Sequence, residues 1–192
     1  MPKKMTTSRR SLRKIGTTRK TKETHIKLQL ELDGKGSAKL NLQDRWLKHM
    51  LEALCKFSGF DLFVEADGDL LHHIDEDIAL TFGKVLRDSI VGRPIRRLGS
   101  GIVAMDDALV MVSVDLVERP FADVSLPDQM LEHFLRSFAL EGRFTLHNVI
   151  MKGKNHHHIS EACFKALGMA LKEATSRSSD SVMSTKGKVI WK

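Results

Sequence analysis

The chain reads "LHHIDEDIALTFGKVLRDSI" over residues 71–90 and "NHHHISEACFKALGMALKEA" over residues 155–174. At an offset of 85 residues the histidines and the glutamate of the two stretches coincide: His72 with His157, His73 with His158, and Glu76 with Glu161. The same offset pairs further identical residues: Val64 with Val149, Gly68 with Gly153, Gly83 with Gly168, and Leu86 with Leu171. The similarity starts before the histidines and continues past them, which indicates an internal duplication.

Each stretch predicts a helix that begins at its histidines and presents metal-ligating groups. Residues three or four apart share a helix face, so Glu76 can converge with either His72 or His73. The two histidines lie about 100° apart around the helix, so one motif can serve two ions. Imidazole and carboxylate without thiolate suit Mn, Fe, Co, Ni or Zn in an open, catalytic site. One such motif alone is typical of a solvated helix start, whereas two in register favour metal binding.

The remaining pattern predicts an α+β fold, an internally duplicated pair of β-sheet and helix half-domains with helices packed on one sheet face. Alternating apolar residues and helical spacing indicate the elements. The expected strands are 23–34, 38–42, 60–68, a hairpin over 101–117, and 143–153; the expected helices are 44–57, 71–90, 128–142 and 155–174. We expect a basic flexible tail over residues 1–12, a first half over 13–94, and a second half over 95–192 that ends with the "STKG" loop.

The formal charge of +7 comes from one end of the chain. Residues 1–22 hold nine of the 31 Lys and Arg and no acidic residue, which leaves 22 basic against 24 acidic residues elsewhere. This basic segment could touch RNA, target the chain to an organelle, or be a disordered extension, and we favour the extension. No RNA-binding motif or basic stripe with interleaved aromatic residues follows, so we do not expect a nucleic-acid partner.

The composition argues against a membrane protein and against a disulfide framework. No run of about 18 apolar residues is present, and the N-terminus lacks an apolar secretory segment, so we expect a soluble, cytoplasmic protein without a membrane partner. The two cysteines, Cys55 and Cys163, fall in helix-like segments without C-x-x-C spacing. We therefore expect two reduced, packed thiols.

Four other histidines carry a weaker signal. His49, in "RWLKHML", and His147, in "FTLHN", each lie alone in an expected element, where a histidine is usually packed or exposed. His25 and His133 belong to no ligand pattern, and we treat both as structural.

A series of ordered motifs between about Arg13 and Lys186 resembles the imidazoleglycerol-phosphate dehydratase family, enzymes of histidine biosynthesis with two H-H-x-x-E motifs and two manganese ions. The matching motifs are "RKTKET" (19–24), "KHML" (48–51), "DGDL" (67–70), "HHIDED" (72–77), "IRRLGS" (95–100), "MDDAL" (105–109), "ERP" (118–120), "HFLRSFA" (133–139), "TLH" (145–147), "HHISEACFKAL" (157–167) and "STKG" (184–187). The resemblance implies a fold of the ribosomal protein S5 domain 2-like type, made of two similar halves, which agrees with the duplication.

The resemblance also implies a role for each matching residue. The implied metal ligands are His49, His72, His73, Glu76, His147, His157, His158 and Glu161. The implied substrate-binding residues, which hold the phosphate, are Arg97, Arg119, Lys165, Ser184 and Lys186. Acid–base catalysis would fall to Glu23 and Glu161, with Glu76 as a further candidate.

The implied reaction dehydrates imidazole glycerol phosphate to imidazole acetol phosphate. The hydrogen to be removed is unactivated, so a simple general base is too weak for it. In the family's mechanism the imidazole ring is held in its anionic form between two metals, which helps it to expel the hydroxyl. The resemblance implies two Mn²⁺ per subunit and a homo-oligomer in which trimers assemble into a 24-mer, with metal sites between subunits. A monomer would then be inactive.

Several positions beside the implied substrate site depart from the family pattern. Lys48 replaces a usual Asp, Ala53 a usual Gln and Phe57 a usual His, and about three residues are missing between "DGDL" and "HHIDED". A lost carboxylate beside His49 could weaken the orientation of that ligand, which typically matters about 10–100-fold in affinity or activity. Two hypotheses follow: a metal-dependent lyase, or a catalytically altered paralogue that keeps the di-metal oligomeric assembly as a binding or structural particle. The retained phosphate-binding residues favour the enzyme.

Overall fold

The computed structural model describes residues 13–178, in which one order of elements occurs twice. The first half contains β1 (Lys14–Lys20), β2 (Thr24–Glu31), β3 (Ala38–Asn41), α1 (Arg45–Ser58), β4 (Asp61–Gly68) and α2 (Leu71–Ile90). The second contains β5 (Leu98–Met105), β6 (Ala108–Asp115), β7 (Phe121–Asp123), α3 (Gln129–Glu141), β8 (Thr145–Lys152) and α4 (His156–Ala174). The duplication inferred from the histidine motifs therefore extends to the order of every described element.

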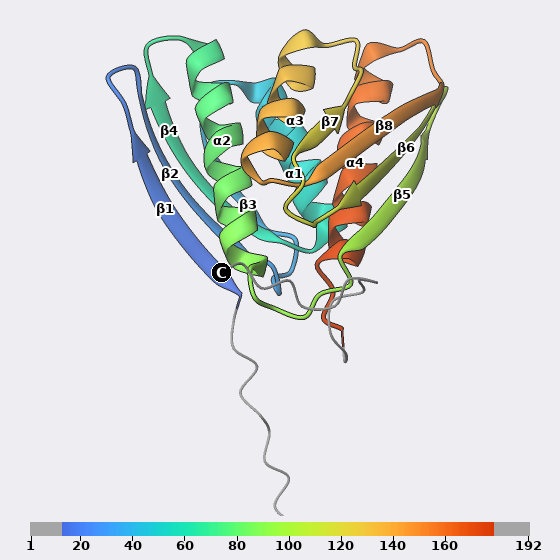
Figure 1. Ribbon diagram of the computed structural model, residues 1–192. Helices are drawn as coiled ribbons and strands as arrows, with labels where there is room; N and C mark the ends of the chain where they lie inside the picture. Colours follow the sequence, from blue (N-terminus) through green and yellow to red (C-terminus); the bar gives the residue numbers. More distant parts are fainter. Residues whose placement is uncertain (1–12, 179–192) are drawn as a thin grey trace, which may run out of the picture.

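The two halves also share one sheet topology. Their strand orders are β1-β2-β4-β3 and β5-β6-β8-β7, with the third strand of each half parallel to its neighbour and the other pairings antiparallel. Figure 1 shows the sheets on opposite sides of the molecule with the helices between them. Each sheet is therefore covered by helices on one face, and the predicted α+β fold class is confirmed.

Strand β1 lies in the basic segment for which the sequence favours an extension. It pairs antiparallel with β2 along its whole length, from Lys14 opposite Glu31 to Lys20 opposite His25. Near its start, the 4% exposed Arg13 donates to both carboxylate oxygens of Asp33 and to the backbone oxygen of Thr175. The expectation of an extension is therefore wrong for residues 13–20, because this segment pairs with β2 as a strand and the charge of Arg13 is compensated by Asp33. Residues 1–12 lie outside the described residues.

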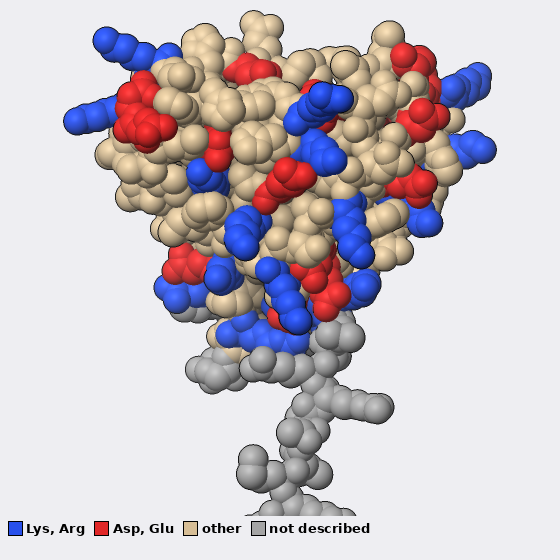
Figure 2. Space-filling model, turned by 180° about the vertical axis from the view of Figure 1, so that it is seen from behind, with Lys and Arg blue, Asp and Glu red and all other residues tan. Residues whose placement is uncertain are grey.

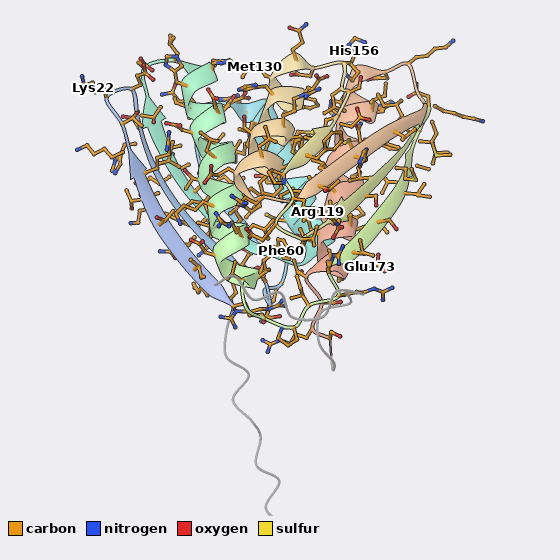
Figure 3. The ribbon with its side chains drawn as sticks, viewed as in Figure 1. Lys22, Phe60, Arg119, Met130, His156 and Glu173 are labelled. Atoms are coloured by element: carbon orange, nitrogen blue, oxygen red, sulfur yellow. The ribbon has the colours of Figure 1, made fainter. Side chains whose placement is uncertain are left out.

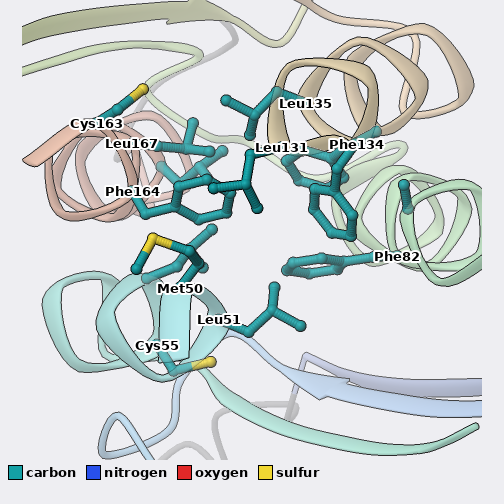
Figure 4. Close-up of a cluster of buried hydrophobic side chains, with 14 of the residues drawn as sticks. Met50, Leu51, Cys55, Phe82, Leu131, Phe134, Leu135, Cys163, Phe164 and Leu167 are labelled. Carbon is teal, nitrogen blue, oxygen red and sulfur yellow. The ribbon is translucent and has the colours of Figure 1, made fainter. Parts of the chain in front are cut away.

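The core lies between the helices. Alternate residues of β2, namely Ile26, Leu28 and Leu30, turn inward and are fully buried. Figure 4 shows side chains from all four described helices meeting in one cluster. The labelled members are Met50, Leu51 and Cys55 of α1, Phe82 of α2, Leu131, Phe134 and Leu135 of α3, and Cys163, Phe164 and Leu167 of α4. Burial of these large apolar side chains supplies the main driving force for folding.

The aligned glycines, Gly83 and Gly168, lie at tight contacts between paired helices. A Cβ on Gly83 of α2 would stand 2.5 Å from the backbone oxygen of Phe138 in α3. A Cβ on Gly168 of α4 would stand 2.6 Å from the backbone oxygen of Leu54 in α1. The duplication thus preserves the residue that lets each pair of helices come together.

Gly168→Ala is expected to destabilise the protein by about 1–2 kcal/mol, because forced separation of α1 and α4 outweighs the better helix propensity of alanine. Thermal unfolding followed by circular dichroism should show a midpoint several degrees lower. The neighbouring Met169→Ala, at a position 40% exposed, is the matched control and should leave the midpoint nearly unchanged. An unchanged midpoint in Gly168→Ala would contradict the steric role of this glycine.

The two cysteines are packed as expected. Cys55 and Cys163 are buried free thiols, and burial raises the pKa of each to about 12. Among the helices of residues 13–178, none is long and apolar enough to cross a membrane. Figure 2 shows Lys and Arg interspersed with Asp and Glu over one face, with basic side chains more closely gathered at its lower end.

Candidate metal sites

Both histidine motifs lie in the first turn of a long helix. The helices begin at Leu71 and at His156. Asn155 caps α4, because its side chain accepts hydrogen bonds from the backbone N–H groups two and three residues later. Figure 3 shows His156 at the same end of the molecule as Met130, in the first turn of α3. Helix starts therefore gather the chemistry-bearing side chains at one end of the fold.

The first group of candidate ligands, here group 1, joins His49 of α1 to His157 and Glu161 of α4. The Nε2 atoms of the two histidines lie 3.1 Å and 3.0 Å from one oxygen, Oε2 of Glu161. Atoms bound to one ion at about 2.0–2.2 Å stand roughly 3–4 Å apart, so these separations suit a shared ion. Burial would raise the pKa of Glu161, but hydrogen bonds from Lys165 and His49 and the charge of Lys165 lower this pKa to about 2.

The second group, group 2, joins His72 and Glu76 of α2 to His133 of α3. Nε2 of His133 lies 3.3 Å from Oε1 of Glu76, and the rings of His72 and His133 stack with their centroids 5.3 Å apart. As in group 1, one ligand atom from each residue lies within 4.8 Å of the others. The sequence pattern marks His133 as structural, yet the fold brings it to a histidine motif.

The second histidine of each motif turns toward different carboxylates. Nδ1 of His73 lies 2.8 Å from Asp69 and 3.8 Å from Glu23 in the turn between β1 and β2. The hydrogen bond with Asp69 raises the pKa of His73. A carboxylate on Nδ1 leaves Nε2 as the nitrogen available to a metal.

His158 has the corresponding surroundings in the second half. Its Nδ1 lies 2.7 Å from Asp107 and its Nε2 lies 3.4 Å from Asp106, both in the turn between β5 and β6. The hydrogen bond with His158, followed by those from two backbone N–H groups, lowers the pKa of Asp107. In each motif, therefore, the first histidine belongs to a group of three candidate ligands, and the second lies near a carboxylate in a hairpin turn.

His147, the remaining implied ligand, lies apart from both groups. It is exposed on β8, with Nδ1 3.7 Å from Oδ2 of Asp123 and its ring centroid 5.4 Å from that of Phe121. Within one chain, no described contact joins it to the motif histidines. The other histidine treated as structural, His25, is exposed on β2.

The implied phosphate-binding residues divide along α4. Arg97 donates to both oxygens of Asp115, and Arg119 lies 3.6 Å from the same carboxylate. The backbone N–H of Arg97 donates to the carbonyl of Ala174, the last residue of α4. Lys165 instead lies one turn after Glu161, 2.8 Å from its Oε1. Ser184 and Lys186 lie outside the described residues.

The three departures from the family pattern have different surroundings. Ala53 is buried in the core, and Lys48 is half-buried on α1. The Lys165 ammonium lies over the Phe57 ring, 5.7 Å from its centroid, which is a cation–π geometry. Phe57 thus packs beside a lysine that pairs with a member of group 1.

A residue of α1 that the sequence marks only as a helix position also borders group 1. The Trp46 ring lies 4.8 Å from that of His157, and its Nε1 donates to Asp128 across the two halves. Trp46 and Asp128 line a pocket of about 340 Å³ together with Pro127, His156, His157 and Ser160. The sequence could not mark Trp46 as a candidate site residue, because its contact with His157 depends on the packing of α1 against α4.

Comparison with known proteins gives one consistent result. A family model described as "Imidazoleglycerol-phosphate dehydratase" matches residues 44–171. A protein of that name from Dictyoglomus thermophilum is 39% identical over 188 residues, which covers 94% of this chain and 100% of that protein. Another of that name, from Dehalococcoides mccartyi, is 44% identical over 183 residues, covering 88% of this chain and 93% of that protein.

Solved structures agree in fold. A crystal structure of IGPD from Pyrococcus furiosus in complex with (S)-C348 has a TM-score of 0.80 and 40% identity, and covers 90% of this chain and 100% of that chain. A crystal structure of imidazoleglycerol-phosphate dehydratase from Staphylococcus aureus has a TM-score of 0.76 and 30% identity, and covers 86% of this chain and 99% of that chain.

Proposed function

The chain belongs to the imidazoleglycerol-phosphate dehydratase family of histidine biosynthesis, and from this premise we propose that it dehydrates imidazole glycerol phosphate to imidazole acetol phosphate in a metal-dependent reaction. The observation that carries the metal dependence is the pair of groups 1 and 2, each with two imidazoles and one carboxylate from two helices. The two donor sets lie at the same end of the duplicated fold, and the imidazole and carboxylate groups of each suit a divalent ion.

The donor chemistry fits two Mn²⁺ per chain. Neither group contains a thiolate, and the ligand atoms of each are close enough to share one ion. We assign one ion to each group, with His73, His147 and His158 completing the coordination from neighbouring copies of the chain. A bound ion would act as a Lewis acid that favours the anionic form of the substrate's imidazole ring and fixes its orientation.

The carboxylates divide between holding the metal and moving protons. A pKa of about 2 keeps Glu161 ionised at neutral pH, which suits a ligand and makes it a weak base. Glu76 belongs to group 2 and has the equivalent ligand role. Glu23 is more exposed and lies 3.8 Å from Nδ1 of His73, in a turn held by hydrogen bonds to the Thr21 hydroxyl. We therefore propose Glu23 as the base that accepts the proton from carbon.

The separation of metal and phosphate residues supports a site shared between chains. Thirteen residues of α4 separate Glu161 from Ala174, which is about 20 Å of helix. Arg97 lies at the Ala174 end and Arg119 beside it at Asp115. Bonds of about 1.5 Å keep the imidazole and phosphorus of the substrate within about 10 Å of each other. One substrate therefore cannot reach both ends of one chain, and a second copy is needed.

The outer sheet faces support assembly through the second half. Ile102, Met111 and Val149 stand side by side across β5, β6 and β8, and the first and last are 56% and 47% exposed. The corresponding row of the first sheet reads Thr18, Lys27 and Glu65. Leu98, Phe121 and Met151 extend the apolar surface, which also carries His147. Apolar side chains gathered on a sheet face are typical of a protein contact. We propose that this face packs against another copy in the trimers and the 24-mer.

Turnover is expected only in the presence of the metal. Purified protein with Mn²⁺ should convert imidazole glycerol phosphate to imidazole acetol phosphate, because metal stabilises the charge that develops on the ring. Chelation should abolish product formation, and added Mn²⁺ should restore it. The assay measures the ketone product by its enol absorbance in alkali. A protein that holds two metals per chain but forms no product would contradict the proposed reaction.

The comparisons do not favour the alternative of a catalytically altered paralogue. Relatives matched over most of the chain carry the dehydratase name, and the residues implied to bind phosphate include Arg97 and Arg119, which lie together in the fold. Arg97 pairs with Asp115, whereas the neighbouring Arg119 is 69% exposed, so its guanidinium is accessible to a substrate phosphate.

A further inference from the structure

The chain that leaves α4 is held by side chains of the first half. Arg13, just before β1, donates to both carboxylate oxygens of Asp33, in the turn that follows β2. Arg13 also donates to the backbone oxygen of Thr175, the residue that follows α4. Arg177 donates to Asp33 as well, at 2.9 Å. One carboxylate of the first half therefore binds two guanidinium groups, and one of these groups contacts the end of α4.

This set of contacts is rigid. Arg13 is buried, and a bidentate pair between an arginine and a carboxylate fixes orientation as well as distance. The hydrogen bond from Arg13 holds the pKa of Asp33 well below its usual range, so the carboxylate is charged at neutral pH. The end of α4 is therefore held in one position relative to β1 and β2.

The same end of α4 holds Arg97, one of the implied phosphate-binding residues. The chain ahead of β5 runs antiparallel beside the chain that leaves α4, with Ile95 bridged to Arg177. The backbone N–H of Arg97 donates to the carbonyl of Ala174 at 2.8 Å. The residue that carries the Asp33 contact is thus the direct neighbour, across this short ladder, of the segment that carries Arg97.

Arg97 has a backbone conformation that depends on these neighbours. Its φ is +74°, in the left-handed region that residues other than glycine rarely adopt. Its N–H donates to Ala174 and its carbonyl accepts from the N–H of Leu116. A strained conformation of this kind persists only where the surrounding structure fixes it. The direction of the Arg97 side chain, which faces Asp115, therefore depends on the position of the end of α4.

We propose that Arg13, Asp33 and Arg177 form a positioning network for substrate phosphate, which acts by fixing the end of α4 and, through it, the backbone of Arg97. All of the implied phosphate-binding residues belong to the second half of the chain, whereas Arg13 and Asp33 belong to the first. The proposal rests on the dehydratase function proposed above and adds to it residues that need not touch the substrate.

The test measures steady-state turnover of imidazole glycerol phosphate by the full chain with saturating Mn²⁺. Asp33→Asn keeps the shape of the side chain but removes the charge that binds both guanidinium groups. Its KM should rise about 10-fold or more, because a small displacement of a substrate-binding group weakens binding strongly. Its kcat should stay within about threefold, because groups 1 and 2 lie at the other end of α4. Inhibition by inorganic phosphate should weaken by the same factor as KM.

Two further variants make the result specific. Lys14→Gln is the matched control, since Lys14 follows Arg13 in sequence but its side chain is 54% exposed and pairs with Glu31 at 3.5 Å. Its KM should stay within about twofold of wild type. Arg13→Lys keeps the charge but cannot reach both oxygens of Asp33 and the Thr175 carbonyl together, so its KM should also rise. This variant decides the question if Asp33→Asn does not fold.

A purely structural role predicts a different outcome. A network that only stabilised the fold would lower the unfolding temperature and the active fraction, and so the apparent kcat, without changing KM or inhibition by phosphate. A KM within about twofold of wild type in folded Asp33→Asn, or in Arg13→Lys if Asp33→Asn does not fold, would overturn the proposal. A wild-type chain that formed no product with Mn²⁺ would instead refute the proposed function on which this network depends.

Discussion

Glu161→Gln should lower the turnover of imidazole glycerol phosphate by about 10³-fold or more. Both histidines of group 1 face the same Glu161 oxygen. An amide in place of this carboxylate removes the negative charge that would bind the metal ion together with the two imidazoles. Glu161 would bind the ion directly, so its loss should exceed the roughly 10–100-fold effect that is typical of residues which only orient a ligand. Initial rates with saturating Mn²⁺ check the expectation, and the same samples should bind one metal fewer per chain.

The matched control is Glu173→Gln on the same helix. Glu173 lies near the opposite end of α4, where it pairs with Arg96 at 2.9 Å, so its loss should change the rate less than about twofold. Figure 3 shows Glu173 at the lower end and His156 at the upper end. If Glu161→Gln kept a rate within 10-fold of wild type, group 1 would not be a catalytic metal site.

The elements that the sequence predicts best are those in which local pattern and tertiary packing agree. Helix α1 shows this, because apolar spacing placed over residues 44–57 corresponds to Arg45–Ser58 with Asp44 as its cap. Strand β1 shows the opposite case, because its basic residues read as a solvated segment. Arg19 of this strand pairs with Asp77, and Arg13, just before it, pairs with Asp33; both partners lie far away in sequence. The pattern of a segment cannot reveal partners that only the fold supplies.

The same limit explains why His133 carries no signal in the sequence. At the offset of 85 residues that aligns the histidine motifs, His133 falls opposite Lys48 rather than His49. The second half has one more residue between this histidine and its motif, so the equivalent positions of His133 and His49 in their helices appear only when the helices are compared by their caps, Asp44 and Asp128. An insertion between two helices leaves the spacing of residues within each motif unchanged, but it alters the number of residues between a motif and a histidine on another helix.

The sequence predicts that the two histidines of each motif meet different neighbours, but it does not predict which neighbours these are. Adjacent histidines must point in directions about 100° apart, which predicts that His72 and His73 meet different groups. Which groups these are depends on the hairpin that carries Glu23 and on the helix that carries His133. The distance of Arg119 from Glu161 likewise follows from the length and direction of α4, and it points to a site that one chain cannot complete.

Mixing two inactive variants should therefore restore activity. Arg119→Ala removes an exposed cation, 69% exposed, and should be inactive or nearly so because the substrate phosphate loses a ligand. Glu161→Gln is inactive for a different reason at the other end of α4. If metal and phosphate residues of one site come from different chains, co-assembly creates some sites with both residues intact. Random pairing gives roughly a quarter of the wild-type activity per site.

The experiment unfolds and refolds the two variants together and measures the initial rate with Mn²⁺. Each variant refolded alone is the baseline, and refolded wild type sets the maximum. A double variant, Arg119→Ala with Glu161→Gln, mixed with wild type controls for dilution. Activity in the mixture of single variants requires that both residues act in one site from separate chains, since no chain present carries both. The contrary result is a mixture that is no more active than either variant alone, in oligomers shown to contain both chains. It would mean that each chain holds a whole site and that the substrate is bound by residues other than Arg119.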